Sequence, residues 1–249
     1  MPRRSDSATG LVIVACLSAG LGCEQIETQA LEAGHHRLQL VVPAGWEHLD
    51  HGRQHLFRSG ECQMSLVDMG IATQEGLVHD LQQAETLWRA GRREDAFARL
   101  RELRGPMLQE KSKDQVAEFW RPWAEVEDRP YPADSATVQA VFTALIEGTA
   151  IFPPVTAEDL TAYVLESRLD TKRYEIASQT PRPVSGAVWT EVETWDRVSH
   201  LARSRLAWTE NGGYLLVLGV DRGPAEQVDA AFAALLTSIQ VVPAAPAPR

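Results

Sequence analysis

The hydrophobic pattern of the chain changes its period twice, and this restricts the fold more than any other feature of the sequence. Residues 37–70 alternate apolar and polar side chains around a turn signal at Ser59-Gly60, which predicts a small meander of strands. After Gly70 the apolar residues recur at helical spacing as far as about residue 148. Strand patterns return beyond residue 170. We therefore expect an α+β fold with a helical segment inserted between two groups of strands.

The helical segment, residues 71–148, predicts a helical hairpin followed by two further helices. Gly91-Arg92 separates the first two helices, and their stretch "AETLWRAGRREDAFARL" resembles one tetratricopeptide-like unit. No second copy follows at a period of about 34 residues, so we expect an insertion and not a repeat array. Asp134 is the predicted N-cap of the last helix, which ends at Gly148.

The last third of the chain predicts a helix, four strands and a closing helix. Thr156 is the expected N-cap of the first helix. The strand-like stretches are "KRYEIAS", "GAVWTEVETW", "SHLARSRLAW" and "GYLLVLGV", and Asn211-Gly212 is a hairpin signal between the last two. The closing helix begins near Pro224. Residues 243–249 are rich in Pro and Ala, and we expect them to be disordered.

The two ends of this pattern resemble a known type of domain. "LQLVVPAGWEHLD" is similar to the start of PsbP-like and DcrB-like domains, and "GAVWTEVETW…NGGYLLVLGV…DAAFAALLTSIQVV" is similar to their end. The resemblance covers residues 37–70 and 149–242, with 71–148 as the insertion. It implies a twisted antiparallel sheet flanked by helices, similar to an α/β/α sandwich. Proteins of these families are mostly assembly, binding or accessory factors at membranes, and they offer no shared catalytic residue to transfer.

The N-terminus resembles the signal peptide of a bacterial lipoprotein. Arg3 and Arg4 precede an apolar run that is too short to span a membrane, and "SAGLGC" follows. The resemblance implies that residues 1–22 are removed and that Cys23 is acylated, with Cys16 as the fallback position. Residues 23–36 then form a polar tether. Multiple acyl chains anchor a protein stably, so we expect a cell-envelope lipoprotein, and Glu24 favours the outer over the inner membrane.

The charge of the chain excludes one class of partner. Its formal net charge is −10 and its pI about 5.2, whereas nucleic-acid binding needs clustered Lys and Arg. The sequence predicts membrane attachment through the N-terminal cysteine and a protein partner, with no nucleic acid and no cofactor.

Three histidines near a cysteine are the strongest candidates for chemistry. His48, His51 and His55, with Cys62, could hold a metal ion, but their spacing matches no usual zinc motif. We favour solvated histidines on a β-hairpin, and we expect Cys62 to be a buried apolar residue of a strand. Elsewhere Glu191 and Glu193 lie on one face of a predicted strand, with Asp196 just beyond. We interpret these three residues as the solvated face of a sheet.

Three of the seven tryptophans fall in the helical insertion. Trp88, Trp120 and Trp123 are candidate partner-binding residues, because Trp is enriched in recognition surfaces. The alternative is that they form the core that joins the short helices.

The sequence thus predicts a lipid-anchored envelope protein without catalytic activity, in a binding or accessory role through protein contacts. One alternative is an envelope carrier of a small molecule or lipid. Another is a metal-dependent envelope enzyme that uses the segment with His48, His51, His55 and Cys62.

Overall fold

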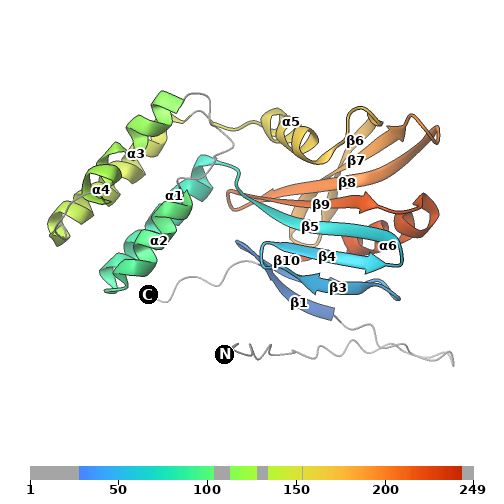
Figure 1. Ribbon diagram of the computed structural model, residues 1–249, viewed down its shortest axis with the longest axis horizontal. Coiled ribbons are helices and arrows are strands. Elements are labelled where there is room, and N and C mark those ends of the chain that lie inside the picture. Colours follow the sequence, from blue (N-terminus) through green and yellow to red (C-terminus); the bar gives the residue numbers. More distant parts are fainter. Residues whose placement is uncertain (1–27, 104–112, 128–133, 153, 243–249) are drawn as a thin grey trace. The chain divides into compact units, whose positions relative to one another are not determined.

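The chain folds into two compact units. The computed structural model describes residues 28–103, 113–127, 134–152 and 154–242. We call residues 1–70, 168–210 and 216–249 the sheet unit, and residues 71–167 and 211–215 the helical unit. Figure 1 shows the elements of both units.

The sheet unit is built on a seven-stranded antiparallel sheet. Its strands follow the order β3-β4-β5-β9-β8-β7-β6, so the first group of strands joins the second where β5 lies beside β9. The helical unit interrupts the chain between β5 and β6 (Figure 1). The strands are β3 (Glu47–Asp50), β4 (Gln54–Ser59), β5 (Cys62–Ile71), β6 (Tyr174–Val184), β7 (Ala187–Asp196), β8 (Leu201–Asn211) and β9 (Tyr214–Arg222).

A smaller sheet and one helix complete the sheet unit. Strands β1 (Thr28–Ala33), β2 (His36–Val41) and β10 (Gln240–Val242) pair in the order β1-β2-β10. Helix α6 (Ala225–Ser238) lies between β9 and β10 in the chain and packs with both sheets, because its apolar stripe belongs to one core with residues of each. That core includes Leu38, Leu40, Phe57, Met64, Leu66, Leu216, Leu218, Phe232 and Leu235.

Strand β1 corrects the predicted tether. Residues Thr28–Ala33 lie inside the segment 23–36 but pair with β2 along their whole length, from Thr28–Val41 to Ala33–His36. Half of the residues of β1 are polar, and its side chains are largely exposed or half-buried. Pairing with β2, and not local apolar content, therefore makes this segment a strand.

The helical unit contains five α-helices. They are α1 (Gln74–Arg89), α2 (Arg93–Leu103), α3 (Lys113–Glu127), α4 (Ser135–Gly148) and α5 (Ala157–Arg168), and a 3₁₀ turn η1 covers Thr149–Ile151. The predicted helix ends are confirmed. The Asp134 side chain accepts a hydrogen bond from the Thr137 backbone N–H (2.8 Å), and Thr156 and Asp159 cap the start of α5 reciprocally.

The tip of the β8–β9 hairpin belongs to the helical unit. The two-residue turn is Gly212-Gly213, one position later than the predicted Asn211-Gly212, and both glycines have positive φ. The Gly213 carbonyl accepts hydrogen bonds from the backbone N–H of Ala72 (2.8 Å) and Thr73 (3.2 Å). A Cβ on Gly213 would lie 2.1 Å from the backbone nitrogen of Gly76 in α1, so both positions need glycine.

These helices and strands confirm the predicted α+β class. The division of the chain into units differs from the predicted domain boundaries. The helical unit extends to residue 167, beyond the predicted end of the insertion at 148, because α5 clusters with the other helices. The predicted signal peptide, Cys16, Cys23 and the tail 243–249 lie outside the described residues. Among the described helices, none combines the length and the apolar character needed to cross a bilayer.

Candidate functional site

The histidine-rich segment forms a β-hairpin, as predicted. Strands β3 and β4 pair with His48 opposite Phe57 and Asp50 opposite His55. Gly52 takes a positive φ of 76° in the turn between them, where the backbone N–H of Gly52 bonds to Asp50 Oδ1 (2.7 Å). A helix, which would align all three histidines, is excluded.

Two of the histidines contact each other, and their hydrogen bonds define the tautomers. His55 Nε2 lies 3.2 Å from the carbonyl oxygen of Glu32 in β1, which can only accept, so this nitrogen carries the proton. In neutral His55, Nδ1 then accepts, and His48 Nε2 donates to it at 3.0 Å. His48 also stacks on Phe57, with ring centroids 5.2 Å apart. The pair therefore joins β3 and β4 to the smaller sheet.

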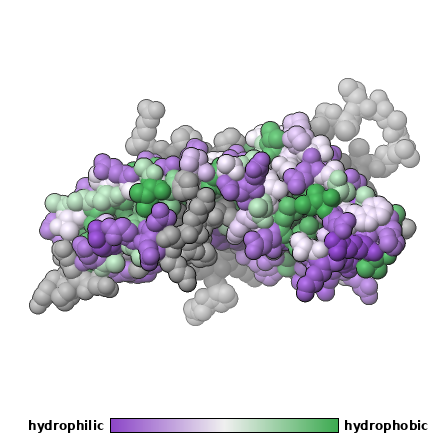
Figure 2. Space-filling model, turned by 90° about the horizontal axis from the view of Figure 1, so that it is seen from above, coloured by the Kyte–Doolittle hydropathy of each residue, from purple (hydrophilic) through white to green (hydrophobic). Residues whose placement is uncertain are grey.

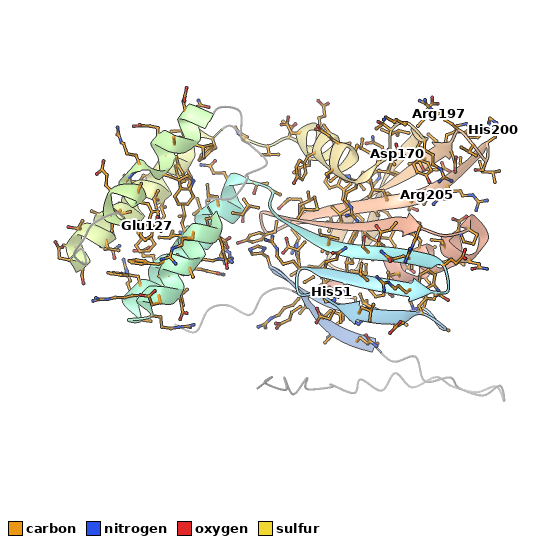
Figure 3. All side chains as sticks on the ribbon, viewed as in Figure 1. His51, Glu127, Asp170, Arg197, His200 and Arg205 are labelled. Atoms are coloured by element: carbon orange, nitrogen blue, oxygen red, sulfur yellow. The ribbon has the colours of Figure 1, made fainter. Side chains whose placement is uncertain are left out.

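The expectation that these histidines are solvated is wrong for His55. Its side chain is completely buried, because β1 covers it, whereas His51 stays in the exposed turn labelled in Figure 3. Burial lowers the pKa of His48, the neighbouring His55 lowers it further, and Asp50 acts in the opposite direction. His48 is thus neutral at neutral pH, and its contact with His55 is structural.

A second buried cluster lies on β5, around Asp68. Its carboxylate accepts hydrogen bonds from the backbone N–H (2.6 Å) and Nδ1 (2.8 Å) of His35, from the Gly70 N–H (2.6 Å) and from Arg53 (3.4 Å). Burial acts to raise the pKa of Asp68, but the bonds and charge of His35 prevail and lower it to about 2. A Cβ on Gly34 would lie 2.1 Å from Asp68 Oδ2, so the β1–β2 turn closes directly on the carboxylate. The sequence analysis missed this cluster.

The structure separates Cys62 from the histidines. Cys62 pairs with Ser59, and His55 pairs with Leu66, so four ladder positions, about 13 Å, lie between them. The thiol is free, buried and directed to Gln227 Oε1 (3.4 Å), as expected for a structural cysteine. Within the described ranges, no three His, Cys, Asp or Glu side chains are grouped to hold a metal ion. The metal-enzyme alternative required His48, His51, His55 and Cys62 in one site, and the fold does not provide it.

The acidic residues of β7 are paired with neighbouring side chains. Glu191 accepts a hydrogen bond from Arg182 (2.8 Å), and Glu193 accepts one from Ser178 (3.1 Å), both across the β6–β7 ladder. This arrangement agrees with the predicted solvated face of the sheet. Asp196 differs, because its side chain is buried.

The three candidate tryptophans of the helical unit are buried, which corrects their predicted role at a surface. Trp88, Trp120 and Trp123 are 8%, 4% and 0% exposed, and all belong to the helical core. Phe97 stacks on Trp88 and packs edge-on against Trp123, with centroids 5.4 and 4.8 Å away. These rings hold the helices together and present no surface to a partner.

The helical unit also contains a polar network that the sequence analysis missed. The Tyr214 hydroxyl, from the hairpin tip, donates to Asp80 Oδ1 (2.7 Å) and accepts from His79 Nδ1 (2.7 Å). Arg99 Nη2 donates to the same Asp80 oxygen (2.8 Å). Asp80 and Tyr214 are buried whereas His79 is exposed, and the network joins α1, α2 and the hairpin tip.

Exposed apolar side chains gather instead at the β7–β8 turn of the sheet unit. We call Trp195, Val198 and Leu201 the turn surface; they are 38%, 75% and 46% exposed. They lie around one turn and not on one face, because Leu201 pairs with Asp196 whereas Trp195 pairs with Ala202, so Trp195 and Leu201 point to opposite sides of the sheet. Figure 2 looks down on this side of the sheet unit and shows apolar residues interrupting its polar surface. Figure 3 shows Arg197 and His200 in the same turn, near Arg205.

Asp196 holds the turn surface in one conformation. Its buried carboxylate accepts hydrogen bonds from the Val198 N–H (2.8 Å), the Ser199 N–H (3.4 Å) and Arg173 (3.0 Å). The bond from Arg173 is the main cause that lowers the pKa of Asp196 to about 2. His200 follows with a φ of 56°, an unusual conformation for a residue with a side chain. The signal in the sequence that could have located this turn is Asp196 directly after Trp195, at the end of the predicted strand, because Asp favours turns.

Comparisons with known proteins found a similarity among solved structures alone. No family model matches the sequence, and no curated protein sequence matches it. Among solved structures, the chain is similar to the solution structure of cyanobacterial PsbP (CyanoP) from Synechocystis sp. PCC 6803. The identity is 13% and the TM-score 0.40, over 91% of this chain and 99% of that one. The resemblance is too distant to carry an argument about function.

Proposed function

We propose that this chain is a lipid-anchored cell-envelope protein that acts without catalysis, by binding a protein partner through the turn surface. The observation that carries this proposal is the exposed apolar group of Trp195, Val198 and Leu201 on a turn fixed by buried Asp196. The proposed anchor is acylated Cys23, for which the lipoprotein-like signal "SAGLGC" is the support.

The composition of the turn surface suits a protein partner. Trp and Arg are the residues that most often dominate binding energy at interfaces, and Trp195 lies beside Arg197. A rigid surface also loses little entropy on binding. Two of the four basic residues near the turn are paired with acidic neighbours, Arg197 with Glu175 (2.7 Å) and Arg173 with Asp196 (3.0 Å), so the proposed contact is defined by its apolar side chains and not by a net charge. The basic residues are Lys172, Arg173, Arg197 and Arg205; the acidic ones are Asp170, Glu175 and Asp196.

Strand β1, the first described element after the proposed anchor, and the turn surface lie at opposite margins of the sheet unit. Strand β1, which follows the proposed anchor, bonds to β4 through Glu32 and His55, and β4 is second from one edge of the large sheet. The turn surface belongs to β7 and β8, and β7 is second from the other edge. Figure 1 shows β1 and β7 on these opposite sides. An anchored molecule therefore turns this surface away from the membrane.

The anchor is tested by the intact mass and membrane partitioning of the expressed protein, wild type beside Cys23→Ser. We expect the wild type to lose residues 1–22, to gain acyl mass and to sediment with membranes, and the variant to do none of these. If both proteins are soluble and identically cleaved, the anchor is refuted. If acylation shifts to Cys16, only the predicted position is wrong.

The partner surface is tested by site-specific photocrosslinking in cells. A photoreactive residue at Val198 should give a discrete protein adduct that Trp195→Ala weakens, because both side chains are exposed around the same turn. The matched control is the same photoreactive residue at Ala144, an exposed position of α4 in the helical unit. An adduct from position 144 and none from 198 would contradict the proposal.

A further inference from the structure

The smaller sheet offers a second surface, on the side where the chain enters the fold. We infer that the turn Val42–Trp46, between β2 and β3, rests in the interface of the bilayer that holds the anchor. This inference rests on the proposed acylation of Cys23 and adds an orientation to it. The end of the β1–β2 ladder at which Thr28 pairs with Val41 faces the lipid.

The length of chain between the anchor and β1 restricts how far the fold lies from the membrane. Strand β1 begins at Thr28, five residues after Cys23, and an extended chain of that length spans at most about 18 Å. With the tether corrected from 23–36 to this short segment, the start of β1 stays close to the acyl chains. Thr28 pairs directly with Val41, the last residue of β2. The turn that follows Val41 thus lies next to this end of the ladder, as does the end of α6, where Ser238 Oγ accepts a hydrogen bond from the Val41 N–H (3.1 Å).

The turn is built to present an apolar end. Its segment "VPAGW" contains no charged residue. A hydrogen bond from the Trp46 N–H to the Pro43 carbonyl (3.0 Å) closes it, and Gly45 has a φ of 77° with open space where a Cβ would be. Ala44 and Gly45 are exposed, while Val42 and Trp46 are half-buried and pack against the core. A half-buried Trp beside an apolar tip is the arrangement that membrane interfaces favour.

Apolar insertion, and not charge, must provide this contact. The chain has a net charge of −10, and Glu24 and Glu27 flank the proposed anchor, so anionic headgroups repel it. We therefore expect contact with zwitterionic lipid that persists at high salt.

The test uses a fluorophore on the acylated full-length product in phosphatidylcholine vesicles. Ala44→Cys gives an exposed thiol for an environment-sensitive label, while the other thiol of the processed chain, Cys62, is buried and Cys23 is blocked by its acyl group. Val198→Cys, in the turn surface, is the matched control. Brominated phosphatidylcholine then reports contact with the lipid by quenching the label.

We expect the label at position 44 to shift to the blue and to be quenched, and the label at 198 to do neither. Quenching at 198 without quenching at 44 overturns the inference, and so does the absence of quenching at both positions in protein whose mass shows acylation. Protein without acyl mass instead refutes the anchor itself. The inference, which rests on that anchor, then fails with it.

Discussion

The helical unit and the sheet unit differ in whether every tryptophan is enclosed. The helical unit encloses Trp88, Trp120 and Trp123, whereas the sheet unit buries Trp189 and Trp208 but exposes Trp195. Short helices have no sheet to lie on, so each apolar stripe needs a large side chain from a neighbour to fill the space between them. A sheet that is already covered by α6 and β2 can leave an apolar residue at a turn. The number of tryptophans in a segment therefore says little about whether that segment binds a partner.

The largest expected effect is a loss of stability on truncating a buried tryptophan of the helical unit, compared with an exposed residue of the sheet unit. Trp123→Ala should lower the free energy of unfolding by about 4 kcal/mol, because a fully buried ring leaves a cavity. Val198→Ala should change it by no more than about 0.5 kcal/mol, since that side chain is mostly exposed. Urea denaturation of both variants measures the difference. Equal losses would contradict the assignment of one residue to the core and the other to a surface.

The next effect tests the close contact between the hairpin tip and α1. Gly213→Ala should cost about 3 kcal/mol, because its Cβ meets the Gly76 backbone and its φ is 89°. Gly212→Ala is the control, with a similar positive φ but open space around its Cβ, and should cost about 1 kcal/mol. Thermal and urea unfolding report both values. If the two variants are equally stable, backbone strain alone explains the glycines.

A smaller effect concerns the buried carboxylate of the sheet unit. The folded pKa of Asp68, about 2, lies below its usual 3.8, so the carboxylate stabilises the fold by about 2 kcal/mol above pH 4. This contribution is lost as the pH falls through about 2. Asp68→Asn should remove it at neutral pH and flatten the acid limb of the stability curve. Glu61→Gln, on an exposed turn, is the control and should leave the curve unchanged.

The smallest effect belongs to the histidine pair. The pKa of His48 lies below its usual 6.5, so its neutral form contributes stability that is present above that pH and lost as the pH falls below it. We expect a loss smaller than about 1 kcal/mol between pH 7 and pH 5, because the side chain is only partly buried. NMR titration of His48 gives the pKa directly, and His48→Gln should weaken the pH dependence. A His48 pKa at or above 6.5 would falsify the arrangement described here.

Local signals in the sequence predicted most elements correctly. Asp134 and Thr156 mark helix starts through side-chain bonds to their own first turn, and Gly91 ends α1 through its positive φ. These interactions span a few residues, so the sequence contains everything that determines them. The same holds for the β8–β9 hairpin, whose turn lies only one position later than predicted.

Features that depend on distant partners escaped prediction. Strand β1 exists because β2 pairs with it, and His55 is buried because the Glu32 backbone covers it. The Asp68 cluster requires a turn that lies more than thirty residues earlier in the chain. In each case the decisive neighbour is set by tertiary packing, which no local pattern of polar and apolar residues encodes.

The contact of Tyr214 with Asp80 has a consequence for the order of folding. The two residues are 134 positions apart, and the chain is synthesised from its N-terminus. Helices α1 and α2 can form early, but the hydroxyl that completes their buried carboxylate arrives only after β8 has been made. Closing so long a loop is slow, and until it closes the start of α1 keeps an unfilled place for the hairpin tip. The packing of α1 and α2 is therefore completed late in folding, after the last third of the polypeptide has supplied Tyr214.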